Sequence, residues 1–120
     1  MKKYLFIVAL LASPAVLAAT DADIVNAVQK KVQNGFFPKD VKVESVTEVR
    51  FFPDDRDTAY ARFGNVCGKA VVSKSNQKAS LVFIAPVVEK SSQISIDGPT
   101  IYDLSKQGAI AEEDLQTKCK

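Results

Sequence analysis

The chain has 120 residues, with 16 basic and 14 acidic side chains and no histidine. The missing histidine removes the commonest general base, the Ser-His-Asp and Cys-His arrangements and most transition-metal sites. A glycine-rich phosphate-binding loop is also absent. We therefore expect no catalytic residues, no metal site, no cofactor and no enzymatic activity.

Residues 1–18 have the pattern of a secretory signal peptide. Lys2 and Lys3 precede an apolar run, and Val16-Leu17-Ala18 places small residues before a cleavage site. Cleavage is expected after Ala18, with Ala19 as the alternative. The product would be one small α+β domain, residues 19–120, in the periplasm of a Gram-negative bacterium or outside the cell. No stable membrane insertion is expected after cleavage.

Removal of Lys2 and Lys3 leaves 14 basic and 14 acidic residues in the processed chain. The basic balance of the precursor therefore disappears on processing. A nucleic-acid-binding surface needs an excess of lysine and arginine to neutralise phosphates. We expect no nucleic-acid partner.

An amphipathic helix is predicted over residues 21–34. Thr20 is its expected N-cap, and acidic residues follow in the first turn. Apolar residues recur on one arc at helical spacing, and polar residues lie opposite them. We expect the helix to pack on a sheet, with Ile24 and Val28 buried and Asn26 and Gln33 exposed.

Alternating residues then predict a strand over residues 41–51, in which Ser45-Val46 interrupts the alternation and suggests a bulge. The expected apolar face carries Val41, Val43, Thr47, Val49 and Phe51, and the solvent-facing side carries Lys42, Glu44, Glu48 and Arg50. Further strands are predicted over residues 58–63, 66–73, 78–85 and around Ile94 and Ile96. Gly64-Asn65 is expected to bend the chain, and Pro86 to follow the end of a strand.

Short connections between these strands favour an antiparallel meander, since parallel pairing needs long crossovers. A short helix is predicted over residues 110–118, with acidic residues early and Lys118 late. The predicted fold class is α+β. An N-terminal amphipathic helix packs on a four- to five-stranded antiparallel sheet in two layers, followed by a short C-terminal helix.

Cys67 and Cys119 are the two cysteines of the chain. In an oxidising compartment an even pair of cysteines is most simply a disulfide. The bond would tie the middle of the chain to its C-terminus and stabilise the fold by about 4 kcal/mol in the chain-entropy account. The alternative is a redox site, but neither a Cys-x-x-Cys pair nor a lone activated thiol is present.

The turn after the first strand is rich in carboxylates. A solvated turn is the simplest interpretation of this segment, and Asp54, Asp55, Arg56 and Asp57 are also a candidate contact loop for a basic partner. Calcium is the alternative occupant, although the EF-hand spacing and its closing glutamate are absent. The run 75–78 matches the short S-x-x-K motif of serine enzymes, but the companion motifs are missing. We interpret that run as a hairpin turn.

The stretch of residues 53–85 contains a pattern similar to D-x-x-S-A-x-F-x-N-V, followed by a Cys-Gly pair, an asparagine-containing turn and an aromatic strand. The matching residues are Asp57, Thr58, Ala59, Phe63, Asn65, Val66, Cys67, Gly68, Asn76 and Phe83. In this pattern the chain resembles small secreted proteobacterial proteins with no assigned activity. Thr58 replaces the serine, and the family's later asparagine and Gly-Tyr pair are absent. The resemblance implies relatedness and no mechanism.

These features favour a small exported interaction domain without catalysis, whose partner is another periplasmic or envelope protein. One alternative is an inhibitor or immunity-type protein against a cell-wall hydrolase, with the acidic loop in a basic cleft. Another is a small glycan hydrolase that uses paired carboxylates, although no pair is marked out. A third is an accessory subunit of an envelope assembly that uses its sheet edge or helix.

Overall fold

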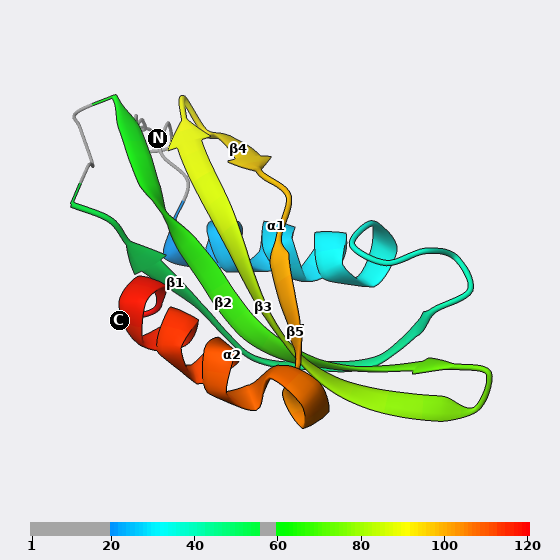
Figure 1. Cartoon of the computed structure of the whole chain (residues 1–120). Coiled ribbons are helices and arrows are strands. Elements are labelled where there is room, and N and C mark those ends of the chain that lie inside the picture. The colour runs from blue at the N-terminus through cyan, green and yellow to red at the C-terminus, as the bar shows by residue number, and fades with distance from the viewer. Residues whose placement is uncertain (1–19, 56–59) are drawn as a thin grey trace, which may run out of the picture.

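The computed structural model describes residues 20–55 and 60–120 (Figure 1). The expected signal peptide lies outside the described residues, as do Arg56 and Asp57 of the candidate contact loop. The elements follow in the order α1 (Asp21–Asn34), β1 (Lys42–Pro53), β2 (Ala61–Lys74), β3 (Gln77–Lys90), β4 (Gln93–Ile96), β5 (Thr100–Asp103) and α2 (Leu104–Lys118). The predicted α+β class, with a helix at each end of an antiparallel sheet, is confirmed.

The strands β2 and β3 form the centre of a five-stranded sheet. They pair without a register shift, from Ala61 opposite Lys90 to Lys74 opposite Gln77. β1 pairs with the outer side of β2, while β4 and β5 pair one after the other with the opposite side of β3. Two-residue turns join β2 to β3 and β3 to β4, so the predicted meander is confirmed.

The helix α1 has the predicted bounds. Thr20 Oγ1 accepts a hydrogen bond from the Asp23 N–H at 3.1 Å, and Asp23 Oδ2 accepts one from the Thr20 N–H at 2.9 Å. These reciprocal bonds form a capping box and lower the pKa of the Asp23 carboxyl. The expected faces are confirmed, with Ile24 and Val28 buried and Asn26 and Gln33 exposed.

Two register shifts against β2 keep the apolar residues of β1 on one face. One falls between Val43 and Ser45 and the other between Thr47 and Arg50. Each shift adds a residue and returns the next valine to the core side. The predicted bulge beside Ser45 is confirmed, but Thr47 is exposed and Val46 takes the core position expected for it.

The predicted bend at Gly64-Asn65 is wrong, because both residues belong to the continuous strand β2. A β-carbon on Gly64 would clash with the backbone carbonyl of Phe52 in the neighbouring strand and would lie 2.7 Å from the ring of Phe51. Glycine is needed here because the neighbouring strand and an aromatic ring both approach the backbone closely, and not because the chain turns.

The predicted end of a strand at Ala85 is also wrong, because β3 continues through Pro86 to Lys90. The Pro86 carbonyl accepts a hydrogen bond from the Asp97 N–H at 2.9 Å, so the outer side of Pro86 faces the interruption between β4 and β5. Proline lacks an N–H and cannot donate a hydrogen bond to a neighbouring strand. At Pro86 this has no cost, because β3 has no paired strand on that side between β4 and β5.

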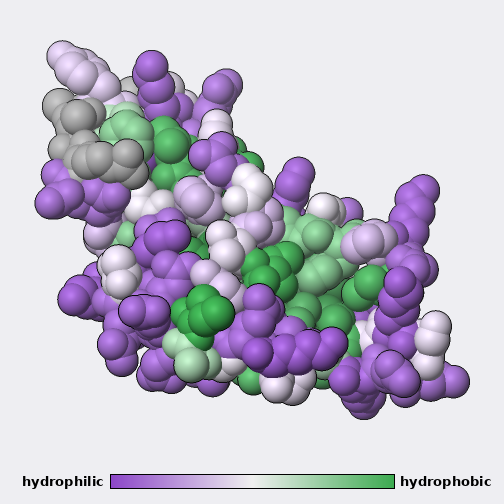
Figure 2. All heavy atoms as spheres, in the orientation of Figure 1, coloured by the Kyte–Doolittle hydropathy of each residue, from purple (hydrophilic) through white to green (hydrophobic). Residues whose placement is uncertain are grey.

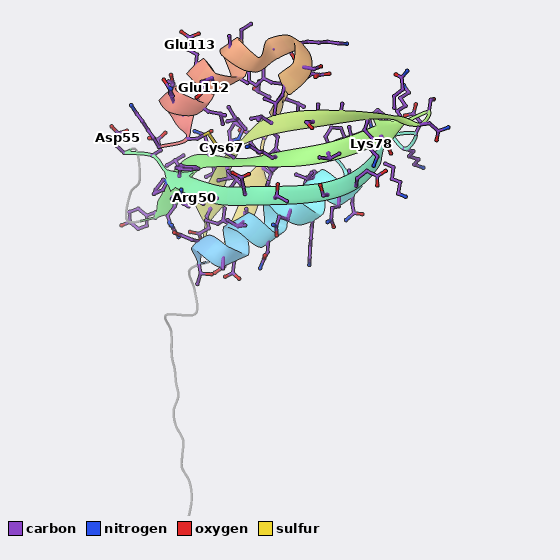
Figure 3. The ribbon with its side chains drawn as sticks, turned by 90° about the horizontal axis from the view of Figure 1, so that it is seen from below. Arg50, Asp55, Cys67, Lys78, Glu112 and Glu113 are labelled. Carbon is purple, nitrogen blue, oxygen red and sulfur yellow. A yellow bond between two sulfur atoms is a disulfide. The ribbon has the colours of Figure 1, made fainter. Side chains whose placement is uncertain are left out.

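The sheet lies between the two helices, as the view in Figure 3 shows. α1 packs on the face that carries the main core, including Val66 and Phe83. α2 packs on the opposite face, against β3 and β5. The expected two-layer arrangement is therefore corrected to three layers. The physical reason is that successive side chains of β2 point to opposite faces of the sheet, so Cys67 lies on the face opposite Val66. The disulfide from Cys67 to Cys119 therefore holds the end of α2 on that second face.

The C-terminal helix begins at Leu104, earlier than the predicted Ile110, and follows a short strand, β5, that was not predicted. The Asp103 carboxylate caps α2 by accepting hydrogen bonds from the N–H and the hydroxyl of Ser105, at 2.9 and 2.7 Å. A kink at Gln107 separates the first turn from the rest. Only Ala111 of this helix is fully buried, so α2 has a weak amphipathic pattern.

Replacing Val28 with aspartate should lower the free energy of unfolding by about 3–5 kcal/mol, because an unpaired carboxylate would enter the core. Gln33→Asp is the matched control on the exposed side of the same helix, and it should change stability little. Urea denaturation followed by circular dichroism measures both. Equal losses would show that the buried face of α1 is assigned wrongly.

The turn between β3 and β4 places two serines in the left-handed region, with φ of 54° at Ser91 and 67° at Ser92. Glycine adopts this conformation without the clash of a β-carbon. Ser91→Gly should therefore raise the free energy of unfolding by about 0.5–1 kcal/mol. Ser95→Gly in strand β4 should lower it by a similar amount, since glycine weakens a strand. A loss at both positions, in the same denaturation experiment, would contradict this account of the turn.

Candidate functional site

A disulfide and a small apolar contact hold α2 on the sheet. Cys119, which follows the last turn of α2, is bonded to Cys67 in β2, as the cysteine pair predicted. The bond joins residues 52 positions apart, and a loop of that length is stabilised by about 4 kcal/mol in the chain-entropy account. Ala111 is buried beneath the helix, and Leu115 is half-buried. The position of α2 therefore depends strongly on the covalent link.

A polar contact supplements the disulfide. The Tyr102 hydroxyl donates a hydrogen bond of 2.6 Å to Asp114 Oδ2, and Lys118 Nζ lies 3.3 Å from the other oxygen of that carboxylate. The bond from Tyr102 is the main reason that the pKa of Asp114 lies below its usual value. The same bond raises the pKa of Tyr102. This pair joins β5 to the middle of α2.

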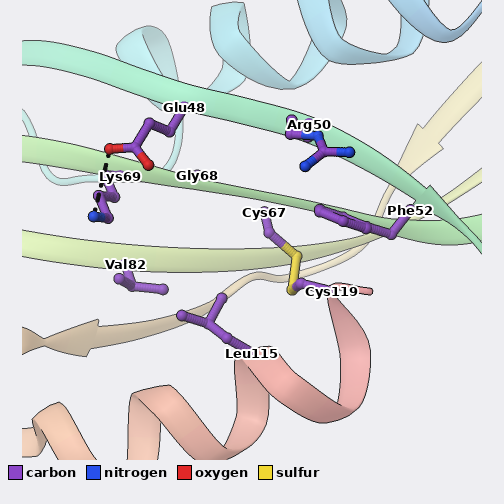
Figure 4. A pocket seen from close by; sticks show the side chains of 9 residues that line it. All are labelled: Glu48, Arg50, Phe52, Cys67, Gly68, Lys69, Val82, Leu115 and Cys119. Atoms are coloured by element: carbon purple, nitrogen blue, oxygen red, sulfur yellow. Dashed lines mark ion pairs between the residues drawn. A yellow bond between two sulfur atoms is a disulfide. The ribbon is translucent and has the colours of Figure 1, made fainter.

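A hollow of about 350 Å³ lies beside the last turns of α2 (Figure 4). We call it the disulfide groove. Its lining side chains and backbone come from four parts of the fold: Glu48, Arg50 and Phe52 of β1, Cys67, Gly68 and Lys69 of β2, Val82 of β3, and Leu115 and Cys119 at the end of α2. The groove exists because α2 packs on β3 and β5 and leaves the β1 side of the same face open.

The second register shift of β1 shapes one side of the groove. Glu48 has a φ of 55°, which is uncommon for a residue other than glycine. The Glu48 carboxylate lies 3.4 Å from Lys69 Nζ. Both side chains are more than half exposed, so this ion pair adds less than about 1 kcal/mol to stability. The bulge therefore positions a charged pair at the rim, as bulges beside binding sites commonly do.

Arg50 lies between this ion pair and the aromatic part of the groove. Its guanidinium stacks over the ring of Phe52, 5.0 Å from the centroid. Among the residues that the structure describes, no carboxylate forms an ion pair with Arg50. On the other face of the sheet, Arg62 stacks over Phe51 in the same way but is paired with Asp21. Arg50 is thus a preorganised cation with no ion-pair partner in the described part of the chain.

The candidate contact loop lies close to the groove. The Asp54 N–H donates a hydrogen bond of 2.8 Å to the Phe63 carbonyl, which closes the β1–β2 connection. Asp54 and Asp55 line a second hollow, of about 390 Å³, together with Lys118 and Lys120. The described carboxylates of the loop therefore face basic residues of this same chain. Contact of the loop with a partner stays a prediction.

The S-x-x-K match lies in the β2–β3 turn, as interpreted. Ser75 and Asn76 occupy its two central positions, with φ of 52° and 66°. Positive φ at both positions is typical of a type I′ hairpin turn. Local turn geometry accounts for these residues.

The sequence placed Glu48 and Arg50 on the solvent-facing side of a strand, but the groove itself was not predicted. Phe52 is two residues from Arg50 in the same strand, so both side chains lie on the same face of the sheet. An aromatic side chain on the predicted solvent-facing side was the one sequence feature that could have indicated a binding surface there. Leu115 and Val82 carried no such signal, because their role depends on which sheet face α2 covers.

Within residues 20–55 and 60–120, no group of three or more cysteine, aspartate or glutamate side chains is placed to hold a metal ion. Neither helix in the same ranges has the length and apolar character that a membrane span requires. Comparison with known proteins finds no matching family model, no matching curated protein and no matching solved structure. The function is therefore inferred from the surface of the molecule.

The contact between Tyr102 and Asp114 predicts a pH dependence of stability. The lowered pKa of Asp114 gives a contribution that is complete above about pH 3.9 and is lost as pH falls through the folded-state pKa. The raised pKa of Tyr102 gives one that is complete below about pH 10 and is lost as pH rises through the folded-state pKa.

Tyr102→Phe should therefore be less stable than the parent near neutral pH, with a difference that narrows in acid and in alkali. Urea denaturation across this pH range measures it. Other carboxylates titrate in both proteins, so only the difference between the two curves reports on this hydrogen bond. A difference that stays constant with pH would mean that the lost hydroxyl acts through something other than Asp114.

Proposed function

We propose that this protein is a non-catalytic binding module of the bacterial envelope, and that the disulfide groove receives a partner segment carrying a carboxylate beside a large apolar side chain. The observation that carries the proposal is Arg50, stacked on Phe52 without a carboxylate partner in the described part of the chain. A planar guanidinium held in place by an aromatic ring is suited to bidentate binding of a carboxylate.

The floor of the groove supports the apolar half of this proposal. Phe52 and Leu115 flank the disulfide, and Val82 lies beyond Leu115, on the side of Lys69. Binding interfaces commonly place one or two buried anchors in such a pocket, with charged groups at the rim. The fixed bond between Cys67 and Cys119 keeps the walls in place, so little conformational entropy is lost on docking.

The charges of the groove favour binding over glycan hydrolysis. Glu48 is the one carboxylate among its described lining residues, and it is paired with Lys69. Hydrolysis of a glycosidic bond generally uses two carboxylates on opposite sides of the bond. A module that docks over the active site of a cell-wall hydrolase would act as its inhibitor, so the inhibitor alternative is one form of the same role.

Export to the envelope is the remaining part of the proposal. A structural disulfide forms and persists in oxidising compartments such as the periplasm and the cell exterior. The pattern of residues 1–18 supports the same compartment.

A random peptide library displayed on phage and panned on the oxidised protein should enrich peptides that combine a carboxylate with an aromatic or large aliphatic residue. The affinity of a selected peptide, measured by fluorescence anisotropy, should fall about 10- to 100-fold in Arg50→Gln, because a charge-assisted hydrogen bond is lost.

Arg62→Gln is the matched control, because it removes the same charge from the same ring-stacked geometry on the opposite face. It should leave peptide affinity unchanged, and thermal denaturation checks that both variants fold. Selected peptides without acidic residues, or equal losses of affinity in both variants, would reject the groove as a carboxylate-binding site.

A further inference from the structure

A further hollow, separate from the disulfide groove, lies where the β2–β3 hairpin meets the start of α2. Its volume is about 560 Å³, and its apolar lining residues are Val41, Val72 and Ala79. Figure 2 shows apolar side chains gathered between α1 and this hairpin, with hydrophilic side chains around them. Apolar patches with a polar rim mark protein or membrane contacts on soluble proteins.

Three lysines from three different elements line the same hollow. Lys74 ends β2, Lys78 is the second residue of β3, and Lys106 lies in the first turn of α2. We call this region the lysine hollow. Figure 3 places Lys78 at the hairpin end of the sheet, away from Arg50 and Cys67. The processed chain has equal numbers of acidic and basic residues, so a cluster of three lysines is a local excess of positive charge.

Nearby carboxylates compensate this charge only in part. Lys74 Nζ lies 3.1 Å from an oxygen of Asp40, while Lys78 and Lys106 form no ion pair with the residues that the structure describes. Asp103 is the one carboxylate among the described lining residues, and it is engaged mainly by Ser105 at the cap of α2. The charge of Lys106 also contributes to the lowered pKa of Asp103, and that of Lys78 to the lowered pKa of Glu44. Lys78 and Lys106 thus lie near Glu44 and Asp103 without forming ion pairs with them, so an external anion can still approach both ammonium groups.

The type of basic side chain in the lysine hollow indicates the type of anion that it is suited to bind. Arginine binds single carboxylates and phosphates through a fixed fork, whereas lysine is a point charge on a flexible stem. No arginine is among the described residues that line this hollow, and its three lysines come from the two strands of the β2–β3 hairpin and the first turn of α2. Such an arrangement suits a diffuse anionic surface better than one anionic group.

We propose that the hairpin end of this protein docks on the surface of an anionic phospholipid membrane. The three lysines contact head-group phosphates, and the apolar floor of the lysine hollow rests at the boundary of the acyl chains. The docking is peripheral and inserts no helix. It does not depend on the partner proposed for the disulfide groove, which lies elsewhere on the molecule.

Sedimentation with vesicles tests the proposal. The protein is prepared without residues 1–18, whose apolar run would bind vesicles by itself. It should bind vesicles of phosphatidylcholine and phosphatidylglycerol at low salt, release as salt approaches physiological strength, and ignore pure phosphatidylcholine. Each lysine near such a surface contributes about fivefold in affinity, so Lys74→Gln, Lys78→Gln and Lys106→Gln together should weaken binding about 100-fold.

The control variant carries Lys30→Gln, Lys90→Gln and Lys120→Gln, which remove the same charge at exposed sites elsewhere on the chain. Its binding should stay close to that of the parent. Gln77 is exposed in the lysine hollow, so Gln77→Glu should weaken binding about fivefold and Gln77→Lys should strengthen it by a similar factor.

Three results would overturn the proposal. One is an absence of binding to the anionic vesicles at low salt. Another is an equal loss in the two triple variants, which would mean that only overall charge matters. The third is displacement from the vesicles by millimolar inorganic phosphate at constant ionic strength, which would indicate a discrete phosphate site. Circular dichroism of each variant separates these results from a loss of fold.

Discussion

The uninterrupted pairing of β2 with β3 is the constraint on which the rest of the structure depends. The two strands stay in register from end to end, so side chains alternate strictly between the two faces of the sheet. One face receives Val66, Phe83 and the apolar side of α1, and the other receives Cys67, Val82 and α2. A shift of one residue would exchange these two sets and leave neither helix with a surface to pack on.

The neighbouring strands adjust to this central pair. β1 needs two bulges to present its unevenly spaced valines to the core, and the second bulge is what turns Glu48 into the groove. The opposite edge is divided into β4 and β5, with the gap beside Pro86. Irregularities thus collect in the outer strands, where a lost ladder bond has the smallest effect on stability.

The two proposed binding surfaces follow from the same incomplete coverage. α2 is too short and too weakly apolar to cover its whole sheet face, so it leaves the disulfide groove open on the β1 side. α1 ends before the tip of the long β2–β3 hairpin, and the lysine hollow lies beyond it. One surface combines an arginine with an aromatic floor, while the other combines lysines with small apolar residues. Their different chemistry suits a protein segment in the first case and a lipid surface in the second.

The sequence by itself determined the features that depend on near neighbours in the chain. The capping residues and periodicity of α1 act within a few residues of one another, and a single pair of cysteines in an oxidising compartment has one intramolecular pairing. The solvent-facing position of Arg50 also followed from local alternation. Only the tertiary structure decided the rest. Gly64 and Pro86 look like breaks until Phe51 and the gap beside β4 are in place, and the groove appears only when α2 is laid on the second face. Those outcomes depend on contacts between residues far apart in the chain, which local propensity does not encode.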